Sequence, residues 1–285
     1  MIAIGQFNTL RIVQARPEGL YLGTAKYQVL LPQPEGPVGA RIGDELNVFV
    51  YTDSQDVPVA TLRQPYAVVG EFATLKVVHA NAQGVFLDWG LAKDLFVPNN
   101  QQQRPLVVGQ NYVVAVYLDE RTNRVAAATR LGRFLDYDVS GVVAGTEVNL
   151  RVYDFSERGA QVIVEGRYSG LVYASEIYTP LVIGQELRGF VDVVRADNKL
   201  DIRLRRQGHQ ASSDAKAIIL ERLKSQGGFL PLHDHSSPDE IRAALGISKK
   251  VFKMAVGGLF RSRRVELVEG GVRLIESEKA GSVAG

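Results

Sequence analysis

The chain contains Gly5-Gln-Phe-Asn-Thr-Leu-Arg-Ile-Val13 and repeats it, with residues of the same classes, as Gly70-Glu-Phe-Ala-Thr-Leu-Lys-Val-Val78. A looser third copy reads Gly145-Thr-Glu-Val-Asn-Leu-Arg-Val-Tyr153. Two further glycines follow each copy at matching distances, namely Gly19 and Gly43, Gly84 and Gly109, and Gly159 and Gly184. Landmarks shared by three copies indicate tandem structural repeats of about 60–65 residues.

Each repeat has the pattern of a small β-structure. Short apolar segments such as Leu46-Asn-Val-Phe-Val-Tyr51 alternate with turns made of Gly, Asn, Asp or Pro, which is typical of β-strands. About five such strands form a stable unit when the sheet closes into an OB-type barrel, because closure leaves no exposed edge. We therefore expect a mainly β chain with three tandem barrels, over residues 1–64, 65–135 and 140–207.

The C-terminal part has a different pattern. The polar segment from Gln207 to Asp214 predicts a linker. Three helices are expected. The first covers residues 215–226, the second starts at Ser237 with a capping box, and the third runs from Ser248 to about Arg263. The segments 265–268 and 272–275 flank a Gly-Gly turn and predict a hairpin. This order predicts an α/β winged helix-turn-helix domain over residues 213–276, followed by a frayed tail over residues 277–285.

Composition excludes several classes of protein. With 285 residues, 46% hydrophobic and 22% charged, the chain is expected to fold. It has no cysteine, which excludes disulfides, thiolate metal sites and a cysteine nucleophile. Neither a secretory signal nor a membrane-spanning run is visible, so a cytoplasmic protein with no membrane partner is expected. The net charge of +2 conceals a basic stretch over residues 188–264. This stretch indicates either a polyanion partner or a basic surface that only contacts solvent.

Several segments resemble one known bacterial family, conserved virulence factor B (also called YitL-like), built from three ribosomal-S1-type domains and a C-terminal winged helix. The resemblance covers about residues 1–276. The segments that carry it are Gly228-Phe-Leu-Pro-Leu-His-Asp-His-Ser-Ser-Pro-Asp-Glu-Ile241, Ser248-Lys-Lys-Val-Phe-Lys-Met-Ala-Val-Gly-Gly-Leu259, Asp94-Leu-Phe-Val-Pro98 and Ser169-Gly-Leu-Val-Tyr-Ala-Ser-Glu-Ile177. It implies a cytoplasmic RNA-binding protein that influences gene expression.

In the second repeat, Phe86 matches a position that stacks bases in S1-type domains, and Trp89 is a candidate neighbouring platform. Either ring could instead pack inside the unit or against the adjoining one. Val97 stands where S1-type domains often have histidine, and few cations surround it. We therefore expect the first two units to be mainly structural.

The third repeat and the winged helix carry the other candidate RNA contacts. In the third repeat these are Tyr153, Phe155, Tyr168, Tyr173, Arg203, Arg205 and Arg206. About two of its aromatic residues could belong to the barrel core, and Gln161 replaces the usual strand aromatic. On a helical wheel, Phe252, Ala255, Val256 and Leu259 form the apolar face of the third helix. The cations beside that face, or at the start of the wing, are Lys249, Lys250, Lys253, Arg261, Arg263 and Arg264.

Signals for an enzyme are weak. His233 and His235 lack a third ligand and are interpreted as part of a loop, while His79 and His209 are isolated. No nucleotide-binding or hydrolase motif is present, so we expect no catalytic residue, metal or cofactor. The sequence favours a non-enzymatic protein that prefers single-stranded RNA and regulates expression post-transcriptionally. Two alternatives stay open, a transcription regulator that binds duplex DNA and a scaffold for a protein partner.

Overall fold

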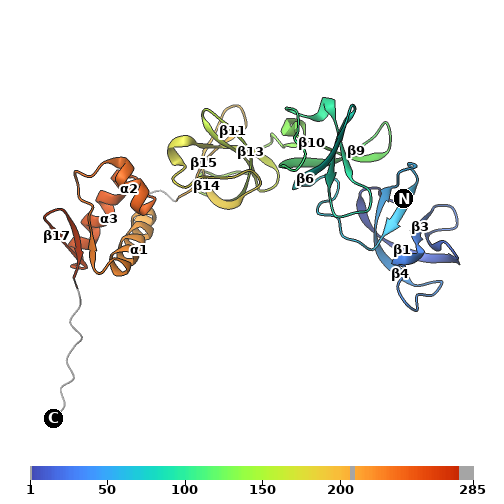
Figure 1. Ribbon diagram of the computed structural model, residues 1–285, viewed down its shortest axis with the longest axis horizontal. Helices are drawn as coiled ribbons and strands as arrows, with labels where there is room; N and C mark the ends of the chain where they lie inside the picture. Colours follow the sequence, from blue (N-terminus) through green and yellow to red (C-terminus); the bar gives the residue numbers. More distant parts are fainter. Residues whose placement is uncertain (1, 206–208, 276–285) are drawn as a thin grey trace, which may run out of the picture.

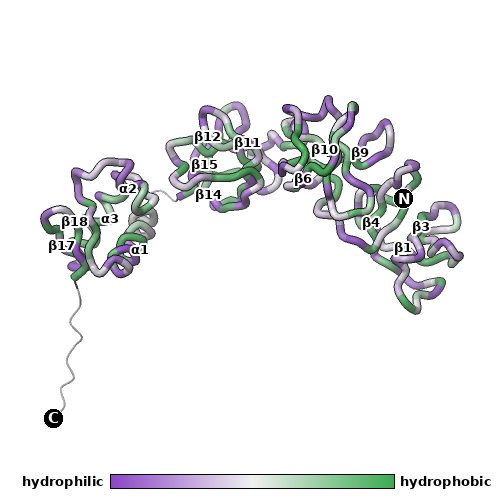
Figure 2. Tube along the Cα trace, viewed as in Figure 1, coloured by the Kyte–Doolittle hydropathy of each residue, from purple (hydrophilic) through white to green (hydrophobic). Residues whose placement is uncertain are grey.

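The computed structural model describes residues 2–205 and 209–275 and consists of four units that follow one another along its long axis (Figure 1). Three of them are closed five-stranded barrels, and the fourth combines three helices with a small sheet. In Figure 2 apolar residues lie along many of the strands, whereas many connecting loops are hydrophilic. The predicted architecture, three OB-type barrels followed by a winged helix, is confirmed.

The three barrels share one strand order, with the third and fifth strands of each running parallel. Unit 1 contains β1 (Gln6–Arg16), β2 (Gly19–Gly23), β3 (Gln28–Pro32), η1 (Gln33–Glu35), β4 (Glu45–Thr52) and β5 (Pro58–Thr61). Unit 2 contains β6 (Phe72–Asn81), β7 (Gly84–Asp88), β8 (Leu95–Pro98), η2 (Asn99–Gln101), β9 (Asn111–Asp119), β10 (Arg124–Ala128) and η3 (Leu131–Phe134). Unit 3 contains β11 (Glu147–Ser156), β12 (Gly159–Val164), β13 (Tyr168–Tyr173), η4 (Ala174–Glu176), β14 (Glu186–Val194) and β15 (Leu200–Arg203).

The repeated glycines have a steric role. A Cβ atom built on Gly84 would lie 2.2 Å from the carbonyl oxygen of Val97, and one on Gly159 would lie 2.0 Å from that of Val172. Only glycine lets the second and third strands approach this closely. The last glycine of each repeat also makes an equivalent hydrogen bond, for example from the Gly109 N–H to the Val77 carbonyl. The glycine spacing therefore reflects the geometry of each barrel.

The winged helix has its own core of apolar side chains from all three helices and the sheet. Its elements are α1 (His209–Ser225), β16 (Phe229–Leu230), α2 (Pro238–Leu245), α3 (Lys249–Arg261), β17 (Val265–Val268) and β18 (Gly271–Leu274). The predicted capping box is confirmed, because Ser237 and Glu240 each accept a backbone N–H of the other. The predicted apolar face of α3 is buried, as expected.

Two boundaries predicted for this domain are wrong. Residues 209–214, expected to be a linker, already belong to α1. None of them is Gly or Pro, so they can extend a helix that Ala215, Ile219 and Leu223 anchor in the core. The helix α3 ends at Arg261 rather than near Arg263, because Arg263 adopts a left-handed φ of 55°.

Candidate nucleic-acid interface

The outer face of unit 2 presents a row of three aromatic rings, one from each of three neighbouring strands. His79 of β6 pairs with Phe86 of β7, and Phe86 pairs with Phe96 of β8. The ring centroids of His79 and Phe86 lie 5.7 Å apart, and those of Phe86 and Phe96 lie 5.0 Å apart. We call His79, Phe86 and Phe96 the aromatic row.

The row faces outward because side chains alternate along a strand. Val85 and Leu87, on either side of Phe86, are buried in the barrel core, and so are Leu95 and Val97, on either side of Phe96. The two Phe rings are half-buried and His79 is exposed. Rings held in this way can stack on the bases of a single strand without any change in the barrel.

A pocket of about 560 Å³ lies over the aromatic row, and its wall includes Ser54 and Asp56 of unit 1. Lys93 of unit 2 holds this part of unit 1 by donating from Nζ to the carbonyl oxygens of Thr52, at 3.0 Å, and Asp53, at 2.6 Å. The Arg124 guanidinium pairs with the Asp56 carboxylate. The pocket is therefore built jointly by two units.

Burial shifts the ionisation of one group in this wall. Partial burial lowers the pKa of the Lys93 ammonium, and Asp56 and Asp53 oppose that shift through their negative charges. Both cations of the pocket, Lys93 and Arg124, are bound to unit 1. These two side chains therefore join units 1 and 2.

Trp89 was expected as a second stacking platform, and this expectation is wrong. Only 2% of its surface is exposed, because the ring packs against unit 1, 5.7 Å from Phe49 and 6.4 Å from Tyr51 between centroids. The alternative interpretation, packing against the adjoining unit, is confirmed. Trp89 fixes the relative position of units 1 and 2, and so helps to shape the pocket.

Val97 was expected at the position where S1-type domains often have histidine, and this assignment was wrong by one residue. In unit 3, Tyr173 stands at the histidine position of the S1-type motif and lies opposite Gly159. Pro98 lies opposite the equivalent Gly84, so Pro98 takes the histidine position in unit 2. Sequence reasoning also missed Phe96 and regarded His79 as isolated. The alternation Leu95-Phe96-Val97 was the signal for Phe96, but His79 meets Phe86 only because of a bulge in β6 between residues 77 and 79.

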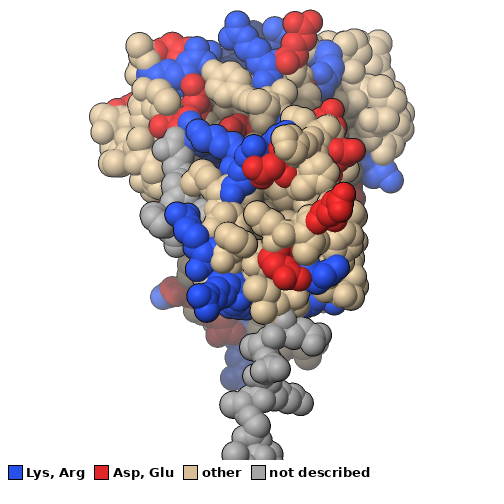
Figure 3. All heavy atoms as spheres, turned by 90° about the vertical axis from the view of Figure 1, so that its left-hand side faces the viewer, with Lys and Arg blue, Asp and Glu red and all other residues tan. Residues whose placement is uncertain are grey.

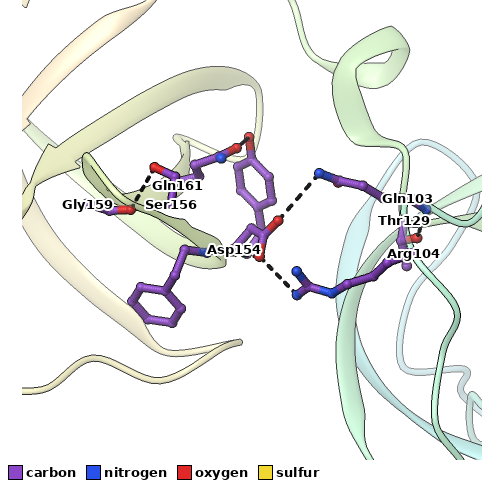
Figure 4. Close-up of polar contacts among 9 residues, drawn as sticks. Gln103, Arg104, Thr129, Asp154, Ser156, Gly159 and Gln161 are labelled. Atoms are coloured by element: carbon purple, nitrogen blue, oxygen red, sulfur yellow. Dashed lines mark hydrogen bonds and ion pairs between the residues drawn. The ribbon is translucent and has the colours of Figure 1, made fainter.

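Unit 3 has no matching aromatic row. Its equivalent positions are occupied by Asp154, Gln161 and Leu171. Figure 4 shows that this region faces unit 2, whose Arg104 Nη2 lies 2.9 Å from Asp154 Oδ1, while Gln103 Nε2 donates to Asp154 Oδ2 at 3.4 Å. The Tyr153 hydroxyl donates to Gln161 at 2.7 Å, and burial raises the pKa of Tyr153. Much of this face is therefore taken up by the junction between units 2 and 3.

The remaining candidates of unit 3 differ in exposure. Phe155 is 43% exposed and Tyr173 is 38% exposed, so both can reach a ligand. Tyr168 is half-buried and packs on the barrel core, with the Arg167 guanidinium 5.2 Å from its ring centroid. Tyr153 packs at the junction with unit 2. About two of these aromatic residues were expected in the barrel core, but only Tyr168 packs there, because Tyr153 packs at the junction instead.

The arginines at the end of unit 3 are engaged inside the protein. Arg203 lies 2.9 Å from Asp192. Arg205 donates to the Gly246 carbonyl of the winged helix, and its guanidinium lies 5.0 Å from the Tyr178 ring centroid. The guanidinium of Arg242 in α2 lies 5.6 Å from the centroid of the same ring. Arg205 thus connects unit 3 to the winged helix, while Arg206 lies outside the described residues.

The cations of the winged helix are accessible. Lys250, Lys253 and Arg261 on α3 are exposed and Lys249 is half-buried, while Arg263 and Arg264 lie in the turn before β17 and not on the helix. Lys253 pairs with Asp234 at 3.4 Å. Figure 3 shows Lys and Arg in several groups at this end of the molecule, with Asp and Glu between them. On the face that Figure 3 shows, the cations therefore do not form one continuous basic patch.

Other classes of site find little support in the described part of the chain. The ring centroids of His233 and His235 lie 6.1 Å apart. His233 Nδ1 accepts the His235 backbone N–H at 3.1 Å, as expected for a loop. Within residues 2–205 and 209–275, no three His, Asp or Glu side chains are grouped to hold a metal ion. No helix within these ranges is long and apolar enough to cross a membrane.

Comparisons with known proteins agree with this architecture. Residues 4–63 and 69–129 match the S1 domain family, and residues 217–274 match the CvfB-like winged helix domain family. The uncharacterized protein YitL of Bacillus subtilis is 28% identical over 268 residues, covering 92% of this chain and 90% of its own. Conserved virulence factor B of Staphylococcus epidermidis is 23% identical over 240 residues, covering 82% and 80%.

A similar solved structure is that of a multidomain protein with nucleic acid binding domains from Streptococcus pneumoniae. It is 25% identical, with a TM-score of 0.45, and the match covers 95% of this chain and 98% of that one.

Proposed function

This chain belongs to the conserved virulence factor B family of S1 and winged-helix proteins, and we propose that it is a non-enzymatic RNA-binding protein that prefers single strands. The observation that carries the proposal is the aromatic row on unit 2. We further propose that it acts in the cytoplasm and regulates bacterial gene expression after transcription.

The aromatic row favours single strands for a physical reason. In a duplex each base is already stacked on its neighbours and paired, so its face is not available to Phe86 or Phe96. In a single strand, an unpaired base can rotate away from its neighbours and stack on such a ring. Each stacked base contributes about 1–3 kcal/mol to binding. Cations elsewhere on the chain would hold the phosphates without reading sequence.

The test is fluorescence anisotropy with a labelled single-stranded RNA of ~16 nucleotides, the upper site size for one OB fold. Phe86→Ala and Phe96→Ala are each expected to weaken binding by at least about fivefold, the effect of losing one stacked base. Tyr27→Ala is the matched control, because Tyr27 is 60% exposed on unit 1 and does not line the pocket. Equal affinity of all four proteins would refute the role of the row.

A second candidate function rests on α3. Its exposed Lys250, Lys253 and Arg261 could face the backbone of duplex DNA, as a recognition helix does. Unlabelled single-stranded DNA and duplex DNA are therefore added as competitors at two salt concentrations. Duplex DNA as the best competitor would favour the transcription regulator. Absence of binding to all three nucleic acids would favour the protein scaffold.

A further inference from the structure

The pocket over the aromatic row has an acidic rim, which restricts what can enter it. Asp94 and Asp119 of unit 2 line it together with Asp56 of unit 1. Its two cations already bind unit 1, since Lys93 donates to two carbonyls there and Arg124 pairs with Asp56. A phosphate group would meet Asp94 and Asp119 without a free cation beside it. The pocket is therefore suited to an uncharged aromatic group with hydrogen-bond donors.

Asp94 is the carboxylate best placed to accept from such a group. It is exposed just before β8, two residues before Phe96, and both side chains line the pocket. Within the described residues, the Asp94 carboxylate makes no hydrogen bond or ion pair. By contrast, Asp119 Oδ1 accepts the backbone N–H of Arg121 at 3.0 Å. The two oxygens of Asp94 are thus available for a pair of adjacent donors.

We propose that this pocket binds one unpaired guanine base of an RNA strand. The base would stack on Phe86 and Phe96, and its N1–H and N2–H₂ groups would donate to the Asp94 carboxylate. Guanine is the base whose Watson–Crick edge carries two adjacent donors. Cytosine and adenine place a ring-nitrogen acceptor beside one amino group, and uracil flanks its single N–H with two carbonyls. A carboxylate therefore discriminates in favour of guanine.

This inference rests on the proposed RNA-binding function and adds base selectivity to it. The probes are labelled ten-nucleotide oligouridines with one central G, inosine, A, C or U. The wild-type chain is expected to bind the G oligomer about tenfold more tightly than the all-U oligomer, as one good two-donor contact allows. Inosine lacks the N2 amino group and is expected to fall between G and U. Equal binding of inosine and guanosine would overturn the two-donor contact.

Asp94→Asn tests the carboxylate directly. An amide has one acceptor and one donor group, so it no longer matches two adjacent donors, and the ratio of G to U affinity is expected to approach one. Glu120→Gln is the matched control, because it removes the same charge from the exposed β9–β10 turn, outside the pocket wall. It is expected to keep the tenfold ratio, whatever its effect on overall affinity.

The outcomes separate the two levels of the proposal. An unchanged G to U ratio in Asp94→Asn, with Phe86→Ala still weakening all oligomers, would overturn guanine recognition and leave RNA binding by the row intact. An unchanged affinity of Phe86→Ala for every oligomer would overturn the proposed function itself.

Discussion

The junction between units 2 and 3 should open when the Asp154 carboxylate is removed. Asp154 is 7% exposed and accepts from Arg104 at 2.9 Å and from Gln103 at 3.4 Å, both across the junction. A hydrogen bond to a charged group contributes about 1.5–3 kcal/mol. Because the Arg104 side chain is 55% exposed, solvent screening places its contribution at the low end, about 1.5 kcal/mol. Asp154→Ala is therefore expected to raise the open population about tenfold.

Single-molecule energy transfer can measure that population. The chain has no cysteine, so Glu120→Cys and Lys199→Cys place two dyes on exposed turns of units 2 and 3 without competing labels. Asp154→Ala is expected to add a state of low transfer efficiency. Asp197→Ala is the matched control, since Asp197 pairs with Arg195 within one exposed turn of unit 3.

A double-mutant cycle with Arg104→Ala completes the test. If the two side chains act as a pair, the effects of the single changes should overlap, so that the double variant opens little more than either one. Additive effects, or no new low-efficiency state in Asp154→Ala, would refute the assignment of the pair as the polar link of the junction. Apolar packing around Ile163 would then have to hold the junction alone.

Other parts of the chain permit further tests. Trp89→Ala should destabilise the paired units 1 and 2 by about 3–5 kcal/mol through loss of the buried ring, measured by urea unfolding. Ser237→Ala should cost the winged helix about 1 kcal/mol, seen as a lower unfolding midpoint, because its hydroxyl caps α2. The Ser237 backbone N–H lowers the pKa of Glu240 from its ordinary value of 4.5. The stabilisation that the Glu240 carboxylate adds is therefore present above about pH 4.5 and disappears as the pH falls through the lowered pKa of the folded state. Glu240→Gln should remove that part of the pH dependence, and an identical profile in both proteins would contradict it.

Local patterns in the sequence were sufficient to predict the fold. The glycines of each repeat mark places where a side chain would strike a neighbouring strand, as at Gly84, so their spacing reports the barrel directly. The capping box at Ser237 and the apolar face of α3 likewise depend on residues within a turn or two. The start of α1 was missed because residues 209–214 have a polar, turn-like composition.

The candidate site was predicted only in part. Phe86 was identified from its motif, and its ring faces outward in the row. Phe96 and His79 joined it only through strand pairing and the bulge in β6. Trp89 and Arg205 have the residue types of nucleic-acid contacts, but one is buried against unit 1 and the other binds the Gly246 carbonyl.

The sequence by itself thus determined three barrels, a winged helix and the residue types able to meet a polyanion, because periodicity, glycine spacing and capping act over short stretches of chain. Tertiary structure decided which barrel face stays open. The face of unit 3 meets Gln103 and Arg104, about 50 residues earlier in the chain, whereas that of unit 2 forms a pocket with Asp56. Whether an outward side chain meets solvent or a neighbouring unit depends on how whole domains pack, and no local pattern encodes that.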